Sequence, residues 1–458
     1  MEDTQGSIAW RFTSEGESVS LPTIAGESVY VGDSAGYLYA IGIQSGTEEW
    51  RFETGGPINS APVVADGLVC VGSNDRTLYA LDQKTGETQW TVGIIGDINN
   101  SPTVSDGVLY LGTEGGHLYA IDVTDGEEVW RVSVGSGFSQ NPVSSAPTIV
   151  GDVVYFGDSS GSLHAVNKET GDEYWRLRTN GAIRSTPTVV DGVVYFGSTD
   201  GTLYAADATS GEHLWEFRTD GRITSSPTIA DETIYVGSHG GTLYALDAET
   251  GEKQWRHRVS DRIEASPTVA GDTVYIGNSK GRLYAVNATE GTRDWHLDIS
   301  EQITSPLISG GVAYLGSGAR TLYAIEVGEN DSSRDSRVLL GSMGHHDQHV
   351  DSDETTITDE QVRADIKREL EKADMEIGGT EEASTRKLKI NTEILDDAKR
   401  EITETANEKR TTSSSVDDAV SQLQNMQGGE SETASGDSVD AQADALRELK
   451  DQQQESDE

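Results

Sequence analysis

The sequence predicts an all-β fold, an eight-bladed β-propeller of four-stranded blades, followed by an acidic C-terminal tail. Three observations lead to this prediction. Tryptophans recur at a fixed interval, a proline and a Leu-Tyr-Ala triplet keep the same interval, and each interval contains four short strand patterns. A period of about 40 residues is typical of propellers and solenoids, in which every repeat packs on its neighbours.

All eight tryptophans follow the repeat, with a spacing of 40 residues except for one interval of 45. They are Trp10, Trp50, Trp90, Trp130, Trp175, Trp215, Trp255 and Trp295. A large, flat, apolar ring that recurs at one position is a packing device. We therefore expect the tryptophans to dock each blade onto its neighbour.

Residues 187–219 show how the strands of one repeat are predicted. Short runs rich in Val, Tyr, Leu and Phe alternate with Asp-Gly pairs and with the turn sequence Asp-Ala-Thr-Ser-Gly. Such runs between turn residues are typical of strands joined by hairpins. In the turns, Asp accepts local hydrogen bonds and Gly supplies a positive φ. The repeat therefore encodes one antiparallel blade.

The first and last repeats are incomplete, and they complement each other. Seven complete repeats span residues 22–299, and residues 303–326 supply only three further strands. The missing strand stands in residues 7–12, so we predict that the N-terminal strand completes the last blade and removes two unpaired edges. The predicted domains are a propeller over residues 1–328, a polar His-containing linker over 329–357 and an acidic, partly helical or disordered tail over 358–458.

The chain is strongly acidic, with 78 Asp and Glu against 34 Lys and Arg and a formal net charge of −44. Such a surface repels phosphates, so we expect no nucleic-acid partner. The acidic excess covers the repeats as well as the tail, and lysines are few. This pattern favours a protein from a salt-accumulating halophile, because molar salt shortens the Debye length to about 3 Å and screens self-repulsion.

The sequence also bears on location. No run of 18 apolar residues is present, so we expect no membrane-spanning helix. The N-terminal residues show neither a signal-peptide pattern nor a lipobox. We therefore expect a cytoplasmic location.

Residues 80–90 carry a family resemblance. They read Ala-Leu-Asp-Gln-Lys-Thr-Gly-Glu-Thr-Gln-Trp, and the same spacing recurs at 205–215 and 245–255, and with Asn for Asp at 165–175 and 285–295. This resembles the tryptophan-docking motif of the PQQ-like, or quinoprotein-type, propeller repeats. The resemblance covers residues 1–326 and implies that each tryptophan packs between blades. That family holds PQQ-dependent dehydrogenases and non-catalytic propellers, such as BamB-type assembly factors.

The chain lacks the features that the resemblance associates with the dehydrogenases. Those enzymes carry a vicinal disulfide over the cofactor, which the single cysteine, Cys70, cannot form. They also have long inter-blade insertions, a calcium set of Glu, Asn and Asp, and a catalytic Asp, for which we find no matching segment. We therefore predict no catalytic residue, no PQQ cofactor and no enzyme. The resemblance favours the BamB-like branch, a scaffold for protein–protein interaction.

Three arginines, Arg184, Arg222 and Arg262, come from consecutive repeats, just before the recurring proline. The neighbouring residues are small and polar, which indicates the mouth of a hydrated channel. In so acidic a chain these arginines would form a basic spot for an anionic ligand, for a quinone or for a partner's carboxylates. The alternative is local pairing with the neighbouring acids Asp220, Asp261 and Glu264. Small-molecule binding or sensing at the channel mouth is thus a second hypothesis, and a PQQ-dependent dehydrogenase is a disfavoured third.

Three of the nine histidines, His345, His346 and His349, follow the propeller. His-x-x-His beside an Asp is a candidate zinc or nickel site. The alternative is a plain polar linker, because no surrounding fold would orient the ligands.

The tail holds no aromatic residue after Tyr323, and residues 350–458 contain 30 acidic against 13 basic residues. Such a segment cannot bury a conventional core. Two interpretations remain open: a solvated tail with transient helices, or a coiled coil that binds a partner or a second copy. We expect unknown protein partners to bind through the propeller face or this tail.

Overall fold

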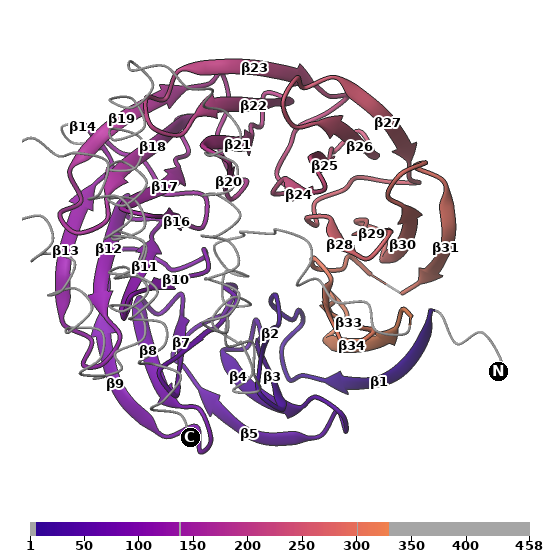
Figure 1. The fold of residues 1–458 in the computed structure, drawn as a ribbon. Coiled ribbons are helices and arrows are strands. Elements are labelled where there is room, and N and C mark those ends of the chain that lie inside the picture. The colour runs from indigo at the N-terminus through magenta and orange to yellow at the C-terminus, as the bar shows by residue number, and fades with distance from the viewer. Residues whose placement is uncertain (1–5, 137–138, 300, 329–458) are drawn as a thin grey trace, which may run out of the picture. The chain divides into compact units, whose positions relative to one another are not determined.

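The computed structural model describes residues 6–136, 139–299 and 301–328. The chain divides into two units, Met1–Ser352 and Asp353–Glu458, and the described residues all belong to the first. They form eight four-stranded antiparallel sheets, which follow one another around a ring (Figure 1). The predicted eight-bladed, all-β propeller is confirmed. The predicted linker and tail lie outside the described residues, so the domain boundaries stay predictions.

Seven blades each use four consecutive strands, from the inner strand to the outer one. Blade one contains β2 (Thr23–Ala25), β3 (Ser28–Gly32), β4 (Tyr37–Gly42) and β5 (Glu48–Glu53); blade two β6 (Val63–Ala65), β7 (Leu68–Gly72), β8 (Thr77–Asp82) and β9 (Thr88–Gly93); blade three β10 (Thr103–Ser105), β11 (Val108–Gly112), β12 (His117–Asp122) and β13 (Glu128–Ser133); blade four β16 (Thr148–Val150), β17 (Val153–Gly157), β18 (Ser162–Asn167) and β19 (Glu173–Arg178); blade five β20 (Thr188–Val190), β21 (Val193–Gly197), β22 (Thr202–Asp207) and β23 (His213–Arg218); blade six β24 (Thr228–Ala230), β25 (Thr233–Gly237), β26 (Thr242–Asp247) and β27 (Lys253–Arg258); blade seven β28 (Thr268–Ala270), β29 (Thr273–Gly277), β30 (Arg282–Asn287) and β31 (Arg293–Asp298).

The eighth blade joins the two ends of the propeller. It contains β32 (Leu307–Ser309), β33 (Val312–Gly316) and β34 (Thr321–Glu326), with β1 (Ser7–Thr13) as its outer strand. β1 runs antiparallel to β34, from the pair Ser7 and Glu326 to the pair Thr13 and Thr321. The predicted closure by the N-terminal strand is confirmed. The longer interval between blades three and four holds a small hairpin of β14 (Gly135–Ser136) and β15 (Ser139–Gln140).

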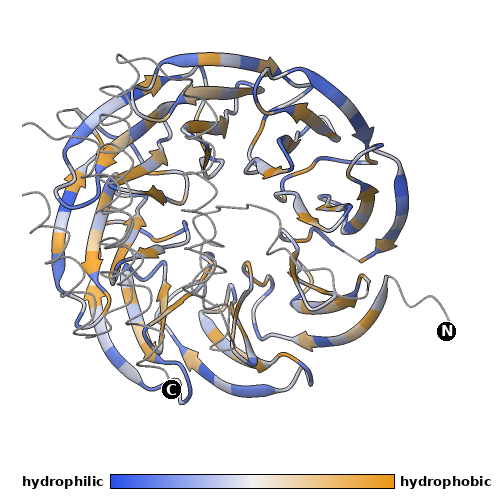
Figure 2. Ribbon diagram, viewed as in Figure 1, coloured by the Kyte–Doolittle hydropathy of each residue, from blue (hydrophilic) through white to orange (hydrophobic). Residues whose placement is uncertain are grey.

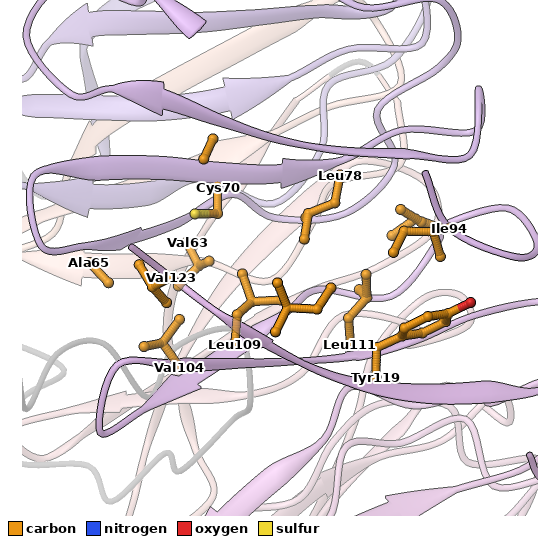
Figure 3. Close-up of a cluster of buried hydrophobic side chains, with 13 residues drawn as sticks. Val63, Ala65, Cys70, Leu78, Ile94, Val104, Leu109, Leu111, Tyr119 and Val123 are labelled. Carbon is orange, nitrogen blue, oxygen red and sulfur yellow. The ribbon is translucent and has the colours of Figure 1, made fainter. Parts of the chain in front are cut away.

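Apolar side chains are buried between neighbouring blades. The second and third strands of each blade are almost wholly buried, whereas an outer strand such as β23 has only half-buried residues that alternate with exposed ones. Figure 2 shows hydrophilic residues along the outer strands. One cluster, between blades two and three, brings Cys70 of β7 together with Leu109 of β11 and Val123 (Figure 3). Cys70 is fully buried where the other blades have a tyrosine. Each blade thus depends on its neighbours for its core.

The tryptophans sit where consecutive blades meet. The indole nitrogen of Trp215 donates to the carbonyl of Ala248 in the next blade at 3.2 Å, and the hydroxyl of Tyr195 donates to the same carbonyl at 3.1 Å. The turn glycine of that next blade, Gly251, has a φ of 70° and lies so close that a Cβ would stand 2.6 Å from the indole ring. This arrangement recurs around the ring, so tryptophan, tyrosine and turn glycine form one docking unit.

The ring has two faces with different parts of each blade. We call the face with the first-to-second and third-to-fourth turns the turn face, and the face with the second-to-third turns and the blade-to-blade connections the connection face. Each connection is held between the turns of two blades. The backbone amide of Ile223 donates to the backbone carbonyl of Ser198 at 3.1 Å. The backbone amide of His239 donates to the backbone carbonyl of Arg222 at 2.8 Å. The connections are therefore fixed in place while several of their side chains remain exposed.

Within the described part of the chain, no helix has the length and apolar character needed to cross a membrane.

Candidate functional site: the channel mouth and the connection face

A cavity of about 210 Å³ lies where the inner strands converge, at the connection face. Its wall is mainly polar, as predicted, and it includes Asn59, Asn99, Asn100, Ser101, Thr186, Thr224, Ser226, Ser266 and Ser305. Hydroxyls hold the wall together, since Ser226 accepts a hydrogen bond from the Thr186 amide at 2.9 Å. Two charged residues, Arg184 and Glu264, line the cavity among these neutral groups. The cavity can therefore offer many hydrogen bonds but few charges.

The three candidate arginines do not occupy one position. Arg184 is three residues before its proline and lines the cavity, whereas Arg222 and Arg262 are five residues before theirs. Arg222 and Arg262 both act on His239. Burial lowers the pKa of this histidine, the two arginines lower it further, and Glu264 opposes them. The structure thus brings Arg222 and Arg262 to one histidine and places Arg184 in the channel wall.

The local pairing considered as the alternative is present for Arg262 and Glu264, whereas Asp220 and Asp261 pair with other cations. Glu264 stands 3.7 Å from the guanidinium of Arg262 and accepts a hydrogen bond from Gln302 at 2.8 Å. Asp220 instead pairs with Arg258 at 3.6 Å, and Asp261 pairs with Lys280 at 2.8 Å.

Lys280 donates the hydrogen bond that does most to lower the pKa of Asp261, to about 2. Arg184 and Arg222 form no ion pair with any residue that the structure describes. Two of the three candidate arginines are therefore left to meet an outside group.

Sequence reasoning missed two further arginines on this face. Arg178 and Arg218 end the outer strands β19 and β23, are exposed, and form no ion pair with a described residue. A signal for them was present, because each stands three residues after its tryptophan. Together with the three candidates, they make this part of the connection face basic.

Blade four contains a buried polar cluster that sequence reasoning also missed. His164 Nε2 lies 3.2 Å from Asp158, His164 Nδ1 lies 3.0 Å from Glu173, and the imidazole stacks on Phe156. Burial alone would raise the pKa of Asp158, but hydrogen bonds from His164, Ser162 and Ser160 lower it to about 2. Other blades place a tyrosine at the His164 position, so this cluster is a variation on a structural contact.

A calcium-bound quinone does not fit these residues. Among residues 6–136, 139–299 and 301–328, no three His, Cys, Asp or Glu side chains are placed to hold a metal ion. Glu264 is the one carboxylate in the cavity wall, beside amides and hydroxyls. The Cys70 thiol lies in the apolar cluster between blades two and three, and burial raises its pKa to about 12. His345, His346 and His349 lie outside the described residues.

Comparisons with known proteins agree on the propeller. The model of the beta-alanine-activating enzyme beta-propeller matches residues 1–233, half of the chain, and the model of outer membrane protein assembly factor BamB matches residues 150–336. No curated protein sequence matches the chain.

Among solved structures, BamB from Moraxella catarrhalis has a TM-score of 0.63 at 19% identity, covering 70% of this chain and 99% of that one. The computationally designed Ika8 protein has a TM-score of 0.61 at 18% identity, and the match covers 69% of this chain and 98% of that one. Quinohemoprotein alcohol dehydrogenase from Comamonas testosteroni has a TM-score of 0.60 at 15% identity, and the match covers 71% of this chain and 77% of that one. At these identities the likeness shows the fold alone. With the matched family models and the repeated docking unit, it leads to one conclusion: the chain belongs to the PQQ-like β-propeller family.

Proposed function

We propose that the chain is a non-catalytic propeller that binds protein partners through its connection face. The observation that carries the proposal is a set of exposed arginines on the connection face that have no ion partner among the described residues: Arg178, Arg184, Arg218 and Arg222. Arginine presents a planar fork of donors that matches a carboxylate. Propellers commonly bind ligands through loops that several blades contribute to one face, and here those loops carry the unpaired charges.

The likeness to BamB supports a scaffold without assigning its partner. BamB is an assembly factor, and the structure of this chain reproduces nearly the whole length of that protein. The alcohol dehydrogenase has a similar TM-score, 0.60, so the fold does not decide between a scaffold and an enzyme. The choice between them depends on the residues of the site. The channel wall offers hydroxyls, amides, one carboxylate and one guanidinium, which suits recognition better than quinone redox chemistry.

The test uses the full chain as bait in a lysate of its source organism. Three forms are compared: wild type, Arg184→Glu with Arg222→Glu, and Lys84→Glu with Lys253→Glu. The last pair makes the same charge change at exposed positions near the turn face. We expect the arginine variant to lose a stoichiometric partner that wild type and the lysine variant both retain. Equal capture by all three forms would contradict the assignment to the connection face.

A second candidate function is binding of a small anion at the channel mouth. It is favoured by one specific observation: Arg184, which has no ion partner in the described part of the chain, lines a cavity of about 210 Å³. Calorimetric titration with small dicarboxylates, and with PQQ plus calcium, tests it. Saturable heat that Arg184→Ala removes would support this candidate, and a flat titration at both low and high salt would contradict it.

A further inference from the structure

The repeat supplies its own control for the arginines of the connection face. Arg178, Arg218 and Arg258 end the outer strands of blades four, five and six. The same position, three residues after the tryptophan, holds Thr13, Glu53, Gly93, Ser133 and Asp298 in the other blades. The fold therefore accepts a small, neutral or acidic residue there and does not require an arginine.

Charge is unevenly distributed around the connection face. We define the basic sector as the cationic side chains from the end of blade four to the turn of blade seven: Arg178, Arg184, Arg218, Arg222, Arg258, Arg262, Lys280 and Arg282. We define the acidic sector as the exposed or half-exposed acids from the connection after blade eight to the turn of blade three: Glu15, Glu17, Glu53, Asp75, Asp97 and Glu114. In a chain of net charge −44, the basic sector stands out.

Local pairing neutralises the basic sector only in part. Arg258, Arg262, Lys280 and Arg282 have carboxylate partners in Asp220, Glu264, Asp261 and Asp298. Arg178, Arg184, Arg218 and Arg222 have none among the described residues. In the acidic sector, Arg76 pairs with Asp97 at 3.1 Å, while Glu17 and Glu53 have no cationic partner in the described part of the chain. Uncompensated charges of both signs therefore lie on one face.

The two sectors are related by symmetry. A half-turn about an axis in the plane of the ring, through the connections after blades three and seven, exchanges the other connections in pairs. It places blade four over blade three, blade five over blade two and blade six over blade one. The basic sector of one copy then lies largely over the acidic sector of the other. Each contact between the sectors occurs twice, as in every isologous interface.

We propose that two copies of the chain associate through their connection faces, with the basic sector of each copy on the acidic sector of the other. The inference rests on the proposed role of this face as a protein-binding surface, and it names a second copy as an occupant. Nucleic acid is disfavoured as an occupant because the acidic sector of the same face repels phosphates. A second copy uses both sectors, because each sector meets charges of the opposite sign.

Net charge opposes this association at long range, whereas the paired sectors favour it at contact. The Debye length is about 30 Å in 0.01 M salt and about 8 Å in 0.15 M salt. Added salt therefore first removes the repulsion between the two acidic chains, while charges in contact are screened less. We expect association to strengthen from about 0.01 M to about 0.15 M salt and to weaken again near 1 M.

The experiment uses sedimentation of the full chain and two charge-reversal variants. The first carries Arg178→Glu and Arg218→Glu, which reverses two of the four basic-sector cations that lack a carboxylate partner among the described residues. The second carries Glu53→Arg and Asp97→Arg, which reverses two carboxylates of the acidic sector. Each new residue already occurs at the same repeat position in another blade: Glu at Glu53, and Arg at Arg178, Arg218 and Arg222. The fold should therefore accept all four substitutions. The lysine variant described above, Lys84→Glu with Lys253→Glu, is the control on the other face.

The expected result is a wild-type dimer in about 0.15 M salt, a tenfold or larger rise in Kd for either reversal variant alone, and dimers when the two variants are mixed. Mixing restores attraction at both symmetry-related contacts. A monomeric wild type at every salt concentration would overturn the inference, as would dimers of the first variant as tight as those of wild type. Either outcome leaves the proposed function standing if the connection-face arginines still retain a different partner in the lysate experiment.

Discussion

The two faces of the ring are built by one repeat but differ in how far their side chains vary. On the turn face, the same contacts recur from blade to blade: a turn Asp accepting local amide hydrogen bonds, a glycine of positive φ, and a tryptophan of the preceding blade against that glycine. On the connection face, equivalent positions hold Arg, Glu, Gly, Ser, Thr or Asp. The recurring contacts of the turn face maintain the fold, and the variation on the connection face supports the proposal that this face binds partners.

The largest expected effect comes from breaking the docking unit. Trp215→Ala removes the indole ring between blades five and six and its hydrogen bond to Ala248. We therefore expect the free energy of unfolding to fall by about 3 kcal/mol. Thermal or urea unfolding measures the change. Leu214→Ala is the matched control, because Leu214 is adjacent in sequence but 49% exposed. Similar losses for both substitutions would contradict the docking role of the tryptophan.

The buried carboxylate of blade four has the next largest effect, and it depends on pH. The folded-state pKa of Asp158, about 2, lies below the ordinary aspartate value. The ionised carboxylate therefore stabilises the fold above about pH 4, and this contribution is lost as the pH falls toward 2.

We expect Asp158→Asn to cost about 2 kcal/mol at pH 7 and progressively less between about pH 4 and pH 2. Unfolding measured across this range checks the trend. Asp272→Asn, which removes a carboxylate at an exposed turn, is the control variant. A cost that stays constant down to pH 2 would contradict the account of the Asp158 cluster.

Two glycines of the turn face separate the effect of backbone strain from the effect of contact with a tryptophan. Gly251 and Gly192 share a positive φ, of 70° and 77°, but a Cβ on Gly251 would meet Trp215 whereas one on Gly192 would meet nothing within 4 Å. We expect Gly192→Ala to cost about 1 kcal/mol, from backbone strain alone, and Gly251→Ala to cost clearly more. Equal melting temperatures for the two variants would show that the tryptophan does not press on the turn.

The smallest effect on stability is expected on the connection face. Arg184→Ala and Arg222→Ala remove exposed side chains without ion partners among the described residues, so each should change the free energy of unfolding by less than about 0.5 kcal/mol. Unfolding curves that overlay wild type are the expected result. A loss above about 1 kcal/mol would mean that these arginines support the fold.

The fold was largely predictable, because its signals are local and repeated. Trp, Pro, Gly and the strand patterns recur at a fixed interval, so one correctly interpreted repeat gave all eight blades. The shared carbonyl of Ala248 was not predictable, because it depends on how Tyr195 and Trp215 approach the next blade. Likewise, the contact of His164 with Asp158 forms only when a hairpin brings the two together, although the replacement of tyrosine by histidine in the Leu-His-Ala triplet was a visible signal.

The candidate site was predictable only in part. The polar channel mouth followed from the small residues before each proline, and Arg184 does line it. Arg222 and Arg262 stand two positions earlier in the repeat, and that offset takes them to His239 instead. Arg178 and Arg218 join the same face through the ends of the outer strands. Charges gathered from separate blades become a surface only once the ring is closed.

One measurement tests the central claim most directly, that the connection face carries recognition and not stability. In the full chain, Arg178, Arg184, Arg218 and Arg222 are all replaced by alanine, and melting temperature and partner retention are measured on the same preparation. The account predicts an unchanged melting temperature with loss of both the second copy and the lysate partner. A lowered melting temperature, or full retention of both partners, would contradict it.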